Sequence, residues 1–250
     1  MRDHDLTQGP ISGHFRTLAI PAAMGMLFTT LYNVVDVYFA GQISTEAQAG
    51  LAIGFQAFFI MMAVGFGTGA AMSALVGNAR GQKDDATARR LALQGLAYAC
   101  VATAVLVVVG SLVGPALITL VSEPGAYRDA ATGYFYWLLA ALPGFLIAYS
   151  ANGILQAHGD SVTMQRAMMA AFVANIGLNP LFIYGVPGVV PGLGLDGIAL
   201  ATIVAQTGVM VFVVRTVLRL RVVQGAHMSE LSPRLASFRD IFLQMLPTSS

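Results

Sequence analysis

Long apolar stretches alternate with short polar segments along most of the chain. Six stretches are long enough for a helix that crosses a bilayer, which needs roughly 20 residues, and their interiors hold a single charged residue. They cover residues 17–40, 48–76, 91–114, 132–156, 164–185 and 194–217. The segments between them are rich in Gly, Pro, Ser and Asp, as loops are. This pattern predicts an all-α integral membrane protein built as a bundle of six transmembrane helices.

Composition supports a chain whose main partner is the lipid bilayer. Only 10% of the residues are charged and 56% are hydrophobic, whereas a soluble domain carries roughly 25% charged residues. The net charge of +1 and the lack of a basic stripe give no reason to expect a nucleic-acid partner. The first apolar stretch is too long for a cleaved signal peptide, so we expect it to remain as a span.

Basic residues indicate the orientation. With a cytoplasmic N-terminus, 12 of the 13 Lys and Arg residues fall on the inner side, and only Arg128 falls outside. Cytoplasmic loops carry such an excess of positive charge. We therefore expect a multi-pass protein of the cell (inner) membrane with its N-terminus in the cytoplasm.

Four segments follow from these spans. We expect a cytoplasmic tail at residues 1–16, the six-helix lobe at 17–217, a polar cytoplasmic linker at 218–238 and the start of a seventh helix at 239–250. The late fragment MLPTSS echoes AIPAAM in the first stretch. Because many transporters consist of two helical repeats, the seventh helix would begin a second lobe. The alternative is a short amphipathic tail on the membrane surface.

Asp36 is the acidic residue that lies well inside a predicted span. A charge at the bilayer centre costs about 2.5–3.5 kcal/mol on insertion scales, so such a group usually has a role. A buried carboxyl can bind and release a proton or hold a small cation such as Na⁺. Tyr32 and Asn33 share its helix face, and Pro21 should bend the same helix. The alternative is that Asp36 reaches the outer interface and stays hydrated.

The fifth stretch carries two amides, Asn175 and Asn179, four residues apart and hence on one helix face. Pro180 follows directly and frees the carbonyl of Ile176 one turn earlier. Amides and a free carbonyl suit a carboxyl group or an ion. The alternative is that these side chains only bond neighbouring helices, at about 0.6 kcal/mol each.

Catalytic patterns are missing from the sequence. It contains no HExxH, GxSxG or Walker-type phosphate loop. We therefore expect no enzyme, no cofactor and no certain metal site.

Five segments together resemble one transporter family. IPAAMGMLFTTLYNVVDVYFAG resembles the first helix of multidrug and toxic compound extrusion (MATE) antiporters, and GNARGQKDDATARR resembles their basic loop between helices two and three. NGILQAHGDS, NIGLNPLFIYG and GLGLDGIALATIVAQ are similar to the end of helix four, helix five and helix six. The resemblance covers nearly the whole chain in the correct order.

The resemblance implies twelve helices in two lobes around a V-shaped cleft, of which this chain would be the N-terminal lobe. It implies secondary active export of organic cations or toxic compounds in exchange for H⁺ or Na⁺, by alternating access. It implies that Asp36, Tyr32, Asn175 and Thr202 belong to the cation-coupling cluster. It implies that Pro21 bends the first helix. Asn179 stands where many relatives carry Asp. The site would then hold one carboxylate, which favours proton coupling through Asp36.

Two alternatives remain at this point. A lipid-linked oligosaccharide flippase of the same superfamily should have a more cationic cavity, whereas these spans have no interior Arg or Lys. A half-size membrane protein would transport nothing alone and would assemble with a partner. The missing half would be either the second lobe of the same chain or a dimer partner.

Overall fold

The computed structural model describes residues 11–189, 191–224 and 228–245, which are all-helical apart from turns and one isolated bridge residue. The helices in chain order are α1 (Ile11–Ile43), α2 (Thr45–Gly81), α3 (Asp85–Val121), α4 (Ala126–Ala157), α5 (Thr163–Tyr184), α6 (Leu195–Leu218), the 3-10 helix η1 (Met228–Leu231) and α7 (Leu235–Met245). The predicted all-α bundle is confirmed. Most helices are longer than the predicted spans, because hydropathy marks only the apolar part of a helix and not where its hydrogen bonding begins.

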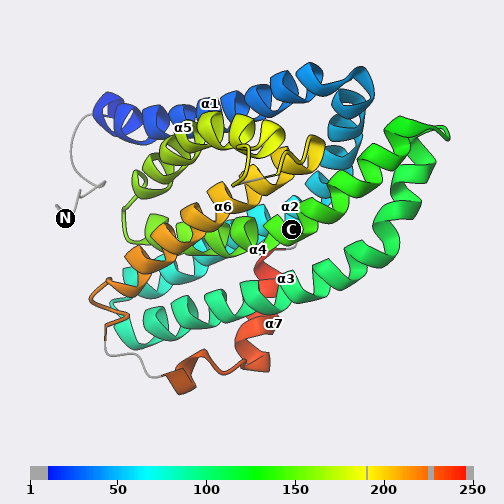
Figure 1. Cartoon of the computed structure of the whole chain (residues 1–250). Helices are drawn as coiled ribbons and strands as arrows, with labels where there is room; N and C mark the ends of the chain where they lie inside the picture. The colour runs from blue at the N-terminus through cyan, green and yellow to red at the C-terminus, as the bar shows by residue number, and fades with distance from the viewer. Residues whose placement is uncertain (1–10, 190, 225–227, 246–250) are drawn as a thin grey trace.

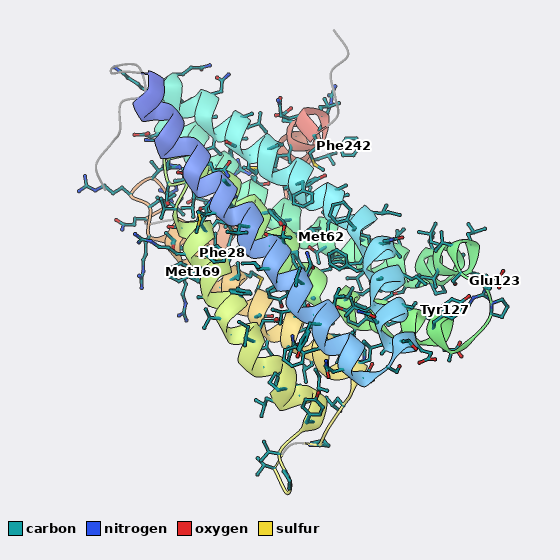
Figure 2. The ribbon with its side chains drawn as sticks, turned by 90° about the horizontal axis from the view of Figure 1, so that it is seen from above. Phe28, Met62, Glu123, Tyr127, Met169 and Phe242 are labelled. Carbon is teal, nitrogen blue, oxygen red and sulfur yellow. The ribbon has the colours of Figure 1, made fainter. Side chains whose placement is uncertain are left out.

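Helices α2 and α4 form the centre of the bundle. α3 and α6 pack against α4, and α5 packs against α6. α1 lies across the outside and contacts both α5 and α2 (Figure 2). In Figure 1 the same order runs from α1 and α5 at the top, through α6, α2 and α4, to α3 and α7 at the bottom.

Small residues allow α2 and α4 to pack closely. A Cβ atom at Gly54 would lie 2.8 Å from the carbonyl oxygen of Ala131, and one at Gly153 would overlap the carbonyl oxygen of Gly69. Helices in membranes associate through such close backbone approach, because burial of apolar side chains gives them no advantage over lipid. The glycines therefore determine how near the two central helices lie.

Side chains cap the starts of α2 and α3. Ser44 accepts a hydrogen bond from the N–H of Ala47 (3.0 Å) at the start of α2. Asp84 accepts one from the N–H of Thr87 (2.9 Å) at the start of α3, and this bond lowers the pKa of the Asp84 carboxyl. Side chains of this kind satisfy N–H groups that a helix start leaves free.

Five helices, α2 to α6, are long and apolar enough to cross a membrane; this count covers only the described residues. α1 overlaps the first expected span, but the side chains of most of its first half lie outside the described residues. The membrane crossing expected for residues 17–40 therefore stays a prediction. α1 continues through Pro21, whose side chain is not described, so the bend at Pro21 also stays a prediction.

The linker region is attached to α3. The buried amide of Gln94 donates to the carbonyls of Glu230 (2.8 Å) and Ser232 (2.9 Å) and accepts from the N–H of Arg234 (2.8 Å). Beyond it, α7 crosses α3 and α2 (Figure 1). α1 begins inside the expected tail, and α7 begins inside the expected linker. The division into tail, lobe, linker and second lobe stays a prediction.

Candidate functional site

Asp36 lies where α1 meets α5 and α6, and only 4% of its surface is exposed. Its Oδ1 accepts hydrogen bonds from the amides of Asn179 (2.8 Å) and Asn175 (3.1 Å). Its Oδ2 accepts one from the hydroxyl of Thr202 (3.3 Å). Three donors from two neighbouring helices thus surround an almost fully buried carboxyl group.

A second layer of hydrogen bonds orients these partners. The hydroxyl of Tyr32 donates to Oγ1 of Thr202 (3.2 Å), and the amide of Asn179 also donates to Oδ1 of Asn175 (3.1 Å). The structure therefore brings together all five residues that the sequence suggested for cation coupling. Asn33, on the same face of α1, donates instead to the backbone carbonyl of Thr29 (3.1 Å) and takes no part in the cluster.

Helical spacing explains this geometry. Tyr32 and Asp36 are one turn apart on α1, and Asn175 and Asn179 are one turn apart on α5, so each pair projects from one face. α1 and α5 pack side by side (Figure 2). The two polar faces then meet, and the amides of Asn175 and Asn179 donate to the carboxyl group of Asp36.

One acceptor in the cluster has no partner. Oδ1 of Asn179 is buried and receives no hydrogen bond from the described residues. The Asn179 side chain as a whole is fully buried. An unpaired buried acceptor costs about 1–3 kcal/mol, and this one belongs to the amide that also donates to Asp36.

The Asp36 cluster borders a cavity of about 80 Å³ between α1, α2, α4, α5 and α6. Asp36 is its one charged lining residue among the described ones. No group of three or more His, Cys, Asp or Glu side chains in the described part of the chain could hold a metal ion. A cation bound here would therefore have Asp36 as its single charged ligand.

Aromatic side chains line the other side of the cavity. Phe59 and Phe66 on α2 lie with ring centroids 6.1 Å apart, and Phe66 meets Tyr149 of α4 edge to face at 4.7 Å. Phe59 is 52% exposed and Phe66 is 43% exposed. Aromatic faces attract cations and stack on flat rings. The cavity thus combines one negative group with an aromatic wall.

A larger hollow of about 330 Å³ lies between α5 and α6. Alanine and other apolar side chains line it, with Arg166 among them, and none of the five cluster residues belongs to it. Apart from Arg166, its lining consists of apolar side chains and glycine.

The sequence analysis missed several cavity residues. Gln206 is 2% exposed and lines the cavity one turn after Thr202; this spacing of four residues on α6 was the signal that pointed to it. Tyr134, Tyr149, Phe59 and Phe66 carry no such signal, because an aromatic residue in a span can equally face lipid.

Comparison with known proteins gives the family. The profile of the MatE family matches residues 21–181. The FAD transporter of Shewanella oneidensis is 27% identical over 81% of this chain and 45% of its own length. The probable multidrug resistance protein YoeA of Bacillus subtilis is 26% identical over 74% of this chain and 40% of its own.

Solved structures agree with the family match. A MOP superfamily transporter from Pyrococcus furiosus superimposes with a TM-score of 0.80 and 25% identity, over 92% of this chain and 50% of that one. The chain spans about half the length of the curated relatives it matches. The family match and the fold together show that the chain belongs to the MatE family of membrane transporters, which are not enzymes.

Proposed function

We propose that this chain forms one lobe of a secondary active exporter that exchanges organic cations for protons. The observation that carries the proposal is Asp36, the one charged group among the described residues that line a cavity walled by aromatic rings. A carboxylate and aromatic faces both attract an organic cation. One carboxyl group can therefore hold either the cation or a proton, and the two compete.

The donors around Asp36 favour H⁺ over Na⁺ as the coupling ion. Two amide N–H groups and a hydroxyl point their hydrogens at the carboxylate. A hard cation needs several oxygen ligands turned towards it, which this arrangement does not offer. Na⁺ would bind only if the amides of Asn175 and Asn179 first turned round.

Asn179 can serve both protonation states of Asp36. Its Nδ2 donates to the ionised carboxylate at 2.8 Å. A half-turn of the amide would place Oδ1, which has no partner among the described residues, where a protonated Asp36 can donate to it. An aspartate at position 179 would repel the ionised form, so the amide suits a site that cycles between charged and neutral Asp36.

Transport then follows from competition between the two ligands. Ionised Asp36 favours the state that holds the organic cation, and protonation from outside removes the charge and releases the cation. A ligand shifts such an equilibrium only by its different affinity for the two states. The α1 bend expected at Pro21 would accompany the change.

A second lobe must complete the cavity. Its volume in this lobe is about 80 Å³, whereas sites for drug-sized molecules usually measure about 300–1,000 Å³. The second lobe would come from the same chain or from a dimer partner. We place the assembly in the cell membrane with the N-terminus in the cytoplasm. A flippase for lipid-linked sugars is disfavoured, because no cationic residue lines the cavity among the described ones.

Proteoliposomes that contain the native protein test this function. An imposed pH gradient should drive transport of a fluorescent cation such as ethidium, and a Na⁺ gradient without a pH gradient should not. Asp36→Asn should abolish both cation binding and proton-driven transport. Asp129→Asn, which removes an exposed carboxylate at the start of α4, is the control and should leave both intact. Normal export by Asp36→Asn would contradict the proposal.

A further inference from the structure

Gln206 is a buried polar residue of the cavity that the Asp36 cluster does not use. Its side chain is 2% exposed. Its Oε1 accepts no hydrogen bond from any described residue. It lines the same cavity as Asp36. Buried amides nearly always have partners, so an unpaired acceptor on a side chain that lines a cavity indicates that a ligand supplies the missing donor.

Close packing of α4 and α6 holds this amide in place. A Cβ atom at Gly144 would lie 3.0 Å from both the carbonyl carbon and Cβ of Gln206. Because Gly144 has no side chain, α6 approaches α4 at this point, and the Gln206 side chain leaves the backbone from a tightly packed position. The base of the side chain is therefore fixed beside α4, and the side chain is buried and does not lie on the surface.

Gln206 lies one helical turn from the charged end of the cavity. Thr202 hydrogen-bonds to Asp36 at 3.3 Å, and four residues of α-helix advance about 6 Å. A molecule that spans both ends needs a cationic centre near Asp36 and an N–H or O–H group about one turn away. Phe66 and Tyr149, which line the same cavity, provide aromatic surface for the rings that join the two groups.

We propose that Gln206 is a substrate-contact residue that accepts a hydrogen bond from an amino or hydroxyl group on a flat aromatic cation. This inference rests on the proposed cation-export function and specifies its substrate class. Ligands that carry such a donor are bound more tightly than N-alkylated ligands of the same ring system. A site that leaves a buried acceptor unpaired discriminates against the ligand that lacks the donor.

Two fluorescent dyes with one ring system test the inference. Proflavine carries two exocyclic NH₂ groups on an acridinium ring, and acridine orange carries dimethylamino groups in their place. Binding of each dye to the native protein in lipid nanodiscs is measured by fluorescence anisotropy. The variants are Gln206→Met, which keeps the unbranched shape, and Gln206→Leu, which has a different shape. Thermal unfolding of each variant, followed by the fluorescence of the single tryptophan, tests whether the variant is folded.

Gln165→Leu is the matched control. Gln165 also has a buried Oε1 without a partner among the described residues, but it does not line the cavity. We expect Gln206→Met to raise the Kd of proflavine roughly 3- to 10-fold and to leave that of acridine orange nearly unchanged. Gln165→Leu should change neither.

Asp36→Asn separates this inference from the function on which it rests. If the wild-type protein binds both dyes and Asp36→Asn abolishes both, the cation site stands. Equal effects of Gln206→Met on the two dyes, or none on either, would then overturn the role of Gln206 alone. If neither dye binds to the wild-type protein, both proposals fail together.

Discussion

Replacing Gly153 by Ala should loosen the centre of the bundle. The new methyl group would overlap the carbonyl oxygen of Gly69 and lie 2.9 Å from its carbonyl carbon and 3.1 Å from its Cα. Ordinary contacts of a Cβ atom begin at 3.4 Å. The backbone of α2 therefore has to move by about 1 Å or more, and a backbone in a helix cannot turn aside as a side chain can.

Two effects oppose each other in this variant. Overpacking of this kind costs about 1–3 kcal/mol, and the upper end applies because the neighbour is backbone. The higher helix propensity of Ala than of Gly stabilises the helix by up to about 1 kcal/mol. The free energy of unfolding should fall by about 1–2 kcal/mol, which corresponds to a decrease in Tm of about 2–8 °C for a chain of this size.

The fluorescence of Trp137, the one tryptophan of the chain, provides the assay. It lies on α4 and packs against the core cluster that contains Phe58. Gly177→Ala is the control, because a Cβ atom there meets nothing within 4 Å, and it should melt at the wild-type temperature or slightly above. A Gly153→Ala variant that melts no lower than Gly177→Ala would refute the close backbone contact between α2 and α4.

Three further predictions use the same protein. Tyr32→Phe removes the bond to Thr202 and should lower the free energy of unfolding by about 1 kcal/mol; an unchanged melting curve would contradict this. Gln94→Leu leaves the linker backbone near Arg234 without partners, so trypsin should cleave there faster than in wild type. Burial lowers the pKa of His158, so its contribution to stability is complete above about pH 6.5 and is lost as the pH falls below that value; melting of His158→Gln should depend less on pH between 7 and 5.

Sequence patterns were most informative where polar residues interrupt apolar runs. Asp36, Asn175 and Asn179 stand out because a polar group in a span costs free energy unless another group satisfies it. Helical spacing alone placed the two amides on one face. The distances that join them to Asp36 depend on how α1 packs against α5, which no local pattern specifies.

Apolar residues gave no comparable signal. In the sequence, Phe59 and Phe66 cannot be told from lipid-facing residues. Lipid and protein interior are equally apolar, so the hydrophobic pattern of a span does not show which face is buried in the protein. The sequence also showed no sign that the linker is bound to α3. Gln94 looks like a polar residue near the membrane surface until the structure shows three backbone partners around it.

Among the described residues Asp36 is the one carboxylate that lines the cavity, and under the proposed exchange this has an energetic consequence for the cell. One Asp36 would take up one proton, so exchange of a monovalent cation for that proton in this lobe would move no net charge across the membrane. The membrane potential, worth about 2.3 kcal/mol per elementary charge per 100 mV, would then contribute nothing to the proposed exchange. The pH difference would limit accumulation, and each pH unit would sustain at most a tenfold gradient of the exported cation.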